Sequence, residues 1–189
     1  MDWNEIRKRG YIEVSGARYD IRHLRVFRFG FSITATSSRP EIDADMEVKF
    51  SSHCVSIGPK KNEKFDFEKI GADYMIVDGS GIKRQFCPDR YELSHRLRDI
   101  IKSLPGGRKC YFTGRKNWIT VEILGAGGTQ KFYDIYFKLK RKPSNYLFMY
   151  LESAFIRDTG KSMGKRKTIG SKVLLGKTLR GEPIVPPPT

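Results

Sequence analysis

Five side chains in the second half of the chain are of the types needed for acid–base chemistry on RNA. Cleavage of RNA without a metal requires a base near the 2′-hydroxyl and a cation near the scissile phosphate. Alternating apolar and polar residues from 118 to 152 predict strands whose polar side chains share one face. The candidate catalytic residues on or beside this face are Glu122, Glu152, Arg115, Tyr136 and Lys138. The same pattern is also typical of a solvated sheet with cross-strand ion pairs, or of a surface that binds RNA without cleaving it.

The second chemical feature is a concentration of positive charge. Between Lys138 and Arg180 the chain has twelve Lys or Arg residues and two acids, a net charge of +10 within a whole-chain formal charge of +15. A cation that neutralises a phosphate releases condensed counterions, so this segment predicts a polyanionic partner. The expected nucleic-acid-binding residues are Lys138, Lys140, Arg141, Lys142, Arg157, Lys161, Lys165, Arg166, Lys167, Lys172, Lys177 and Arg180.

Part of this charge lies in residues 158–172, where Gly160, Gly164 and Gly170 interrupt any helix. We expect a mobile basic arm that follows phosphates, with a merely solvated arm as the alternative. Residues 170–178 end in the Gly-Lys-Thr of a nucleotide-binding loop, but five residues separate the two glycines where four are needed. A strand that ends in a turn is the expected structure there.

Histidine and cysteine spacing predicts neither a metal nor a cofactor. The chain contains His23, His53 and His95, and nothing in their spacing brings two of them together as ligands. Each is expected to be a surface or hydrogen-bonded residue, with general acid or base chemistry as the alternative. Cys54 and Cys110 lie in apolar, strand-like runs, and the cysteines fit no zinc module. We therefore expect free thiols.

Strands must position these groups, because the dominant hydrophobic period is two. Such runs occupy residues 27–34, 46–54, 118–123, 133–140 and 147–155, and residues 117–155 predict a three-stranded meander. One helix is predicted at about 89–104. Its apolar stripe is Leu93, Leu97, Ile100, Ile101 and Leu104, and its expected cap pairs Asp89 with Glu92. A shorter helix over residues 3–9 would be capped by Asp2.

These elements predict a mainly β, α+β fold in which an antiparallel sheet packs on one main helix. Residues 1–180 are expected to form a single domain, followed by a Pro-rich tail at 181–189. The strands within residues 10–87 could form a β subdomain that makes a second layer. No apolar run has the length of about 20 residues that a membrane span needs, and the N-terminus has no apolar stretch of signal length. A cytoplasmic protein without a membrane partner is expected.

The order of a helix followed by antiparallel strands between Asp89 and Phe155 resembles that of small bacterial ribonuclease toxins of the barnase and RelE type. The resemblance is one of element order and assigns no residue. From these features we expect a nucleic-acid-binding protein that takes RNA rather than DNA through its C-terminal basic region. The first alternative is a metal-independent ribonuclease. The second is a protein-interaction subunit that docks on an acidic protein or within a nucleoprotein complex.

Overall fold

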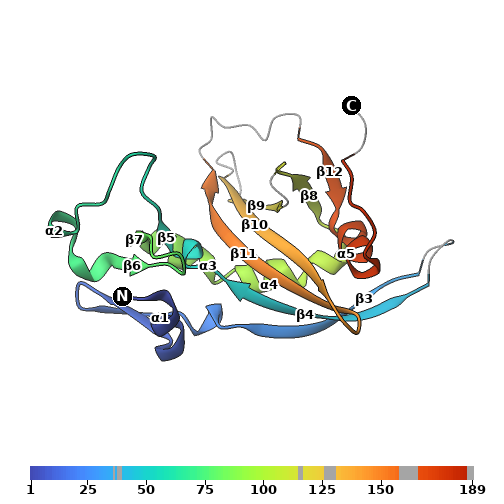
Figure 1. The fold of residues 1–189 in the computed structure, drawn as a ribbon, viewed down its shortest axis with the longest axis horizontal. Coiled ribbons are helices and arrows are strands. Elements are labelled where there is room, and N and C mark those ends of the chain that lie inside the picture. The colour runs from blue at the N-terminus through green and yellow to red at the C-terminus, as the bar shows by residue number, and fades with distance from the viewer. Residues whose placement is uncertain (36, 38–39, 115–116, 126–130, 158–165, 187–189) are drawn as a thin grey trace.

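The main sheet is curled and has seven strands, five from the second half of the chain and two from the first half (Figure 1). The computed structural model describes residues 1–35, 37, 40–114, 117–125, 131–157 and 166–186. The strand order is β12 (Thr168–Gly170), β8 (Lys109–Phe112), β9 (Trp118–Leu124), β10 (Lys131–Lys142), β11 (Tyr146–Arg157), β4 (Ile42–Phe50) and β3 (Phe27–Ile33).

The sheet is antiparallel except where β11 pairs with β4 in parallel. Strands β9, β10 and β11 form the predicted meander, and the predicted mainly β, antiparallel-rich character is confirmed. The predicted second layer is wrong for β3 and β4, since both extend the main sheet. Hairpin β3–β4 can join there because β4 alternates buried Ala44, Met46 and Val48 with exposed or half-buried acids and lysine, which suits a sheet with one covered face.

The remaining N-terminal elements form a smaller unit beside one end of this sheet (Figure 1). Helix α1 (Trp3–Arg9) is the predicted one, and the Asp2 carboxylate accepts hydrogen bonds from the backbone N–H groups of Asn4 and Glu5. Hairpin β1 (Tyr11–Val14)–β2 (Ala17–Asp20) turns at Ser15-Gly16, where both φ angles are positive. A small sheet contains β5 (Ser56–Ile57), β7 (Lys83–Phe86) and β6 (Met75–Val77), with α2 (Phe67–Ile70) before β6.

The expectation of one main helix is wrong, because the described residues form five α-helices. The predicted helix at 89–104 is two helices, α3 (Pro88–Ser94) and α4 (Leu97–Lys102), followed by a 3-10 turn over Leu104–Gly106. Its apolar stripe is nevertheless buried at Leu97, Ile100, Ile101 and Leu104. Ser94 Oγ donates to the Tyr91 carbonyl at 2.6 Å, a back-bond that bends helices.

The expected cap of this helix is also corrected. Cys87 occupies the cap position without a side-chain hydrogen bond, and Pro88 follows at the first helical position. Proline fits there because its missing N–H would have no helical partner. Asp89 therefore lies inside the first turn, where its charge complements the helix dipole, rather than at the cap.

Residues 170–178 differ most from expectation. Only Thr168–Gly170 is a strand, and Ser171–Arg180 forms helix α5. Leu175 and Leu179 are four residues apart, so they share a helical face, and both are buried with Leu174 in the core. Gly181 ends the helix with a left-handed φ of 70°. The leucines that argued against a nucleotide-binding loop are thus core residues of a helix.

The core lies on one face of the main sheet. Tyr133, Ile135 and Phe137 of β10 belong to the same buried cluster as Leu97 of α4 and Leu174 of α5. In Figure 1, α4 passes behind β10 and β11. The helices therefore cover this face, and the side chains between those core residues point to the opposite face. Among the described residues, no helix has the length and apolar character needed to cross a membrane.

Candidate nucleic-acid interface

The face of the sheet opposite the helices combines aromatic rings with charged groups. We call it the open face, and it carries Asp134, Tyr136, Lys138 and Lys140 of β10 and Tyr150, Phe155 and Arg157 of β11. The pairing register places Lys138 opposite Tyr150 and Asp134 opposite Phe155. Because side chains alternate along a strand, these residues share a side while Tyr133 and Ile135 point into the core.

A β-bulge decides which residues of β11 reach the open face. The register shifts between Tyr136 and Phe137, where their partners change from Ser153 to Leu151. Uninterrupted alternation through β11 predicts Phe155 on the apolar face and Ala154 on the polar one. The extra residue, Glu152, reverses this order, since a bulge inverts the alternation beyond it. Phe155 consequently lies beside Tyr136, and Ala154 is buried.

An aromatic stack occupies the middle of the open face. The rings of Tyr136 and Phe155 are stacked with centroids 5.5 Å apart and an interplanar angle of 13°. The guanidinium of Arg90, from α3, lies 5.2 Å from the Phe155 centroid. Both aromatic residues are half-buried. Each ring therefore still has exposed surface, on which an unpaired base could stack.

Arg157 is held by a buried carboxylate. Its Nε donates to Asp134 Oδ2 at 2.9 Å and its Nη2 to Asp134 Oδ1 at 2.6 Å. The Asp134 side chain is only 2% exposed. This two-point hydrogen bonding raises the pKa of Arg157. The guanidinium also lies 5.1 Å from the Phe132 ring centroid. Arg157 is therefore a fixed part of the face, and Asp134 offsets its charge.

Glu152, Lys138 and Tyr136 are the three candidate catalytic residues that the structure brings to one face. Lys138 forms an ion pair with Glu152, and Asn117 Nδ2 donates to the second Glu152 oxygen at 2.5 Å. Both oxygens that could accept a proton from a 2′-hydroxyl already have donors. A bound substrate would have to displace one of them before Glu152 could act as a base.

Glu122 lies on the other side of the sheet. It pairs with Tyr133 rather than with Asp134, so the polar residues of β9 point to the face that carries the β10 core residues. The expectation that β9 adds Trp118, Thr120 and Glu122 to the polar face is therefore wrong by one register step, which moves every side chain across the sheet. Glu122 instead forms an ion pair with Arg108. Arg115 is outside the described residues.

The end of the open face near β8 and β9 is hollowed. A hollow of ≈ 410 Å³ is lined by Arg108, Lys109, Tyr111, Val121, Ile123, Phe132 and Arg157. Two aromatic rings and three cations thus surround a shallow space whose floor includes the 55% exposed Ile123. An aromatic ring with flanking cations suits a base and its phosphate better than it suits a neutral apolar ligand.

The match to known proteins concerns nearly the whole chain. The sequence model of the YjaZ family matches residues 11–179. The chain therefore belongs to the YjaZ family. No curated protein and no solved structure matched the chain. The matched range contains every strand of the main sheet, so the open face and its hollow are part of this YjaZ domain.

The predicted binding cations of this YjaZ chain do not form one surface. Lys138 and Lys140 are exposed on the open face, and Arg141 and Lys142 are exposed at the end of β10. Arg166 and Lys167 lead into β12. Of the other four described cations, Arg157 lies on the open face, and three belong to α5, whose leucines pack in the core, so those three lie on the helix side of the sheet. These are Lys172, which contacts Thr34, Lys177, which contacts the Pro183 carbonyl, and Arg180, which pairs with Glu182. Lys161 and Lys165 lie outside the described residues.

Sequence reasoning missed the partners that flank this face. Arg90 lies in the first turn of the predicted helix at 89–104 and Arg108 follows that helix, and neither belongs to the basic C-terminal segment. His53 was expected on the polar side of its strand, but it lies in a 3-10 turn after β4, with its Nε2 3.2 Å from Asp78 Oδ2. Within the described parts of the YjaZ chain, no group of three or more His, Cys, Asp or Glu side chains could hold a metal ion.

Proposed function

We propose that the protein binds single-stranded nucleic acid, RNA rather than DNA, through the open face and its hollow. The observation that carries the proposal is the hollow lined by Tyr111 and Phe132 together with Arg108, Lys109 and Arg157. Rings stack on unpaired bases whatever their sequence. The cations would contact the phosphates between the bases, Arg108 and Arg157 while still paired with Glu122 and Asp134. The Tyr136–Phe155 stack continues the same chemistry along β10 and β11.

The choice of a single strand follows from the shape of the surface. The rings lie within a sheet face, and a base can reach them only when it is not stacked in a duplex. Exposed Lys140, Arg141 and Lys142 extend the positive charge beyond the rings. Such cations add affinity that depends on salt and not on sequence.

Fluorescence anisotropy with labelled RNA and DNA strands of equal sequence tests this proposal. Affinity should fall with salt at a log–log slope of about −0.7 per phosphate contacted. Phe155→Ala should weaken RNA binding by about 1–3 kcal/mol, or about 5- to 150-fold, because one stacked base is lost. Phe65→Ala is the matched control, since Phe65 is half-buried in a loop and, within the described part of the chain, Phe67 is its one aromatic ring contact.

Two results would overturn the proposal. RNA affinity that stays constant between low and moderate salt would show that phosphates are not contacted. Equal RNA affinities of the Phe155→Ala and Phe65→Ala proteins would show that the open face is not the binding surface. Salt-sensitive binding to acidic proteins in the absence of any RNA binding would favour the protein-interaction alternative.

A metal-independent ribonuclease is a second candidate, favoured by the presence of Glu152, Lys138 and Tyr136 on one face. RNA incubated with EDTA should then be cleaved, and Glu152→Ala should abolish cleavage. Glu122→Ala is a suitable control, because Glu122 is half-buried, as Glu152 is, but lies on the opposite face. Intact RNA after incubation with purified wild-type protein would leave binding as the function.

A further inference from the structure

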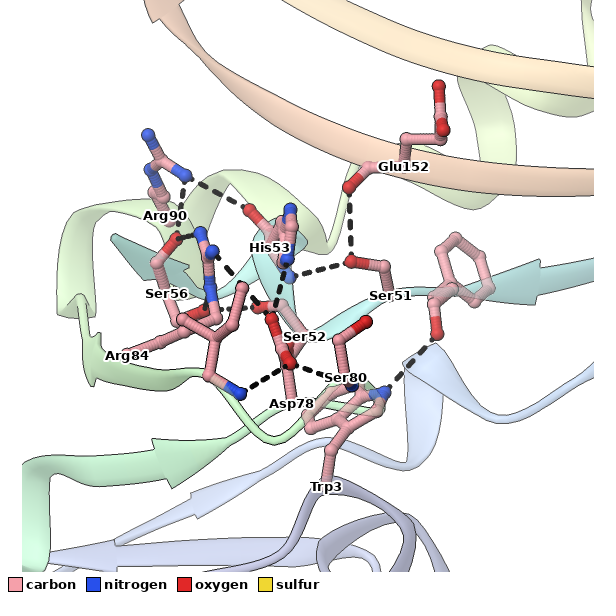
Figure 2. A network of polar contacts seen from close by, with 12 residues as sticks. Trp3, Ser51, Ser52, His53, Ser56, Asp78, Ser80, Arg84, Arg90 and Glu152 are labelled. Atoms are coloured by element: carbon pink, nitrogen blue, oxygen red, sulfur yellow. Dashed lines mark hydrogen bonds and ion pairs between the residues drawn. The ribbon is translucent and has the colours of Figure 1, made fainter. Parts of the chain in front are cut away.

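A second hollow lies where the smaller N-terminal unit meets the main sheet. We call it the β4-end hollow. It measures ≈ 310 Å³, at the lower limit of ligand-sized pockets of about 300–1,000 Å³. The residues that line it and are used below are Trp3, Arg7, Lys49, Ser52, His53 and Tyr150. Figure 2 shows the polar network at this junction, with His53 between the turn that carries Asp78 and the end of β4.

Asp78, the acid that lines the β4-end hollow, already has hydrogen-bond partners within the protein. Asp78 is 7% exposed, and its Oδ1 accepts hydrogen bonds from the backbone N–H groups of Ser80 and Ile82 at 2.8 and 3.0 Å. Its Oδ2 faces His53 Nε2 at 3.2 Å, so that nitrogen carries the proton. Arg84 lies 4.0 Å from the same oxygen. Arg84 thus partly offsets the negative charge of Asp78, and both carboxylate oxygens already accept hydrogen bonds from the protein.

Several donors in the wall have no protein partner. Ser52 is 1% exposed, and its buried Oγ has no hydrogen-bond partner. Arg7 contacts Asn4 through Nη2, while its buried Nε has no partner. Lys49 forms no hydrogen bond or ion pair with any described residue. Folded proteins seldom leave buried donors unpaired, because each costs about 1–3 kcal/mol. An acceptor-rich ligand would satisfy these two buried donors and would also pair with the half-buried Lys49.

The β4-end hollow adjoins the open face. Tyr150 of β11 pairs with Lys49 of β4 on one side and with Lys138 of β10 on the other. Facing residues of paired strands lie on the same side of the sheet, so Lys49, Tyr150 and Lys138 form a row across it. A strand that crosses the open face would reach the hollow at the edge of this row, where Trp3 and Phe50 close its floor.

We propose that the β4-end hollow binds the terminal phosphate of a nucleic-acid strand, with Arg7, Lys49 and Ser52 as its ligands. A terminal phosphate is a monoester with a charge of about −1.5 to −2 and three acceptor oxygens. It matches two cations and a hydroxyl better than an internal diester, which has a single charge. The ring of Tyr150 would contact the terminal nucleotide. Only the identity of the ligand as part of a strand depends on the proposed function.

Small ligands test the phosphate site by itself. Inorganic phosphate, adenosine 5′-monophosphate, adenosine 3′-monophosphate and adenosine are titrated separately while the ring signals of His53 are followed by NMR. The phosphates should shift these signals to saturation, and adenosine should leave them unchanged. The nucleotide that binds more tightly, the 5′- or the 3′-monophosphate, identifies which end of a strand the hollow binds. Arg7→Gln and Lys49→Gln should each weaken nucleotide binding about tenfold or more, since a charge-assisted hydrogen bond is lost.

Lys60→Gln is the control for charge, because Lys60 is exposed in a loop outside the hollow. Ser52→Ala reports on the unpartnered hydroxyl and keeps the net charge. Melting temperatures show whether the variants are folded. The proposal is overturned if none of the phosphate compounds shifts the His53 signals. It is also overturned if the folded Arg7→Gln and Lys49→Gln proteins bind nucleotides as tightly as the Lys60→Gln protein does.

Oligonucleotides separate this inference from the proposed function. RNA with the preferred terminal phosphate should bind about tenfold or more tightly than the same strand with a terminal hydroxyl, and Ser52→Ala should reduce that ratio. Equal affinities would overturn the terminal-phosphate site and leave binding to the open face intact. Saturable nucleotide binding without any binding of oligonucleotides would support the phosphate site and overturn the proposed function.

Discussion

Replacing Arg157 with methionine would leave the buried carboxylate of Asp134 without its cation. Asp134 is 2% exposed and receives two hydrogen bonds from the guanidinium. Removing one partner of a buried ion pair typically costs about 3–5 kcal/mol, because the remaining charge has lost its water and its partner. A domain with about 5–15 kcal/mol of stability would lose a large part of it.

The measurement is urea unfolding followed by circular dichroism. With a denaturant slope of about 2 kcal/mol/M, the midpoint should fall by roughly 1.5–2.5 M and the slope should be unchanged. The double variant Arg157→Met/Asp134→Leu should recover most of this loss, since two apolar groups of similar size remove both charges. A single Arg157→Met variant that loses less than about 1 kcal/mol would refute the reasoning. Arg157 would then be a cation that contributes little to folding.

Three further predictions concern the core and its titrating groups. Leu97→Ala should lose about 2–5 kcal/mol of unfolding free energy and the exposed neighbour Arg96→Ala little, and equal losses would contradict the helix phase. Burial, together with the charge of His95, lowers the pKa of His23 from 6.5 to about 4. Folding therefore favours neutral His23. Its contribution to the unfolding free energy, measured by urea titration, should be complete above about pH 6.5 and should be lost as the pH falls towards 4. His23→Gln should flatten that dependence, and an unchanged profile would contradict it. Burial raises the pKa of Cys54 and Cys110 to about 12, so iodoacetamide at pH 8 should modify half-buried Cys87 first, as mass spectrometry of digested protein would show.

Local patterns predict the elements of this protein well where a single period extends through a segment. The apolar stripe from Leu97 to Leu104 is buried as expected, and Asp2 caps the first helix through its carboxylate. Such features depend on neighbours within about one helical turn, which a sequence displays directly. Helix α5 was missed because glycines at 170 and 176 and a Gly-Lys-Thr triplet outweighed the spacing of Leu175 and Leu179.

The candidate site was harder to predict, because it depends on register. One extra residue at Glu152 moves Phe155 to the open face, and one step of pairing moves Glu122 away from it. Neither change alters the apolar pattern enough to be seen in one sequence. The β4-end hollow joins residues from positions 3 to 150, so only the tertiary structure brings them together. The residues Asp78-Gly79-Ser80-Gly81 predict a turn, but the sequence does not show that the Asp78 carboxylate accepts a hydrogen bond from His53.

The parallel pairing of β11 with β4 has a consequence for how the chain acquires its structure. Ser51 Oγ donates to the carbonyl of Glu152, which is 101 residues later in the sequence. During synthesis, β4 must remain without its neighbour β11 until most of the chain has left the ribosome, and contacts of such long range form slowly. Hairpin β3–β4 exposes Phe27, Phe29 and Phe31 along one side in that interval. The nascent chain is therefore most prone to aggregation before β11 is made, and chaperone demand should fall once it is complete.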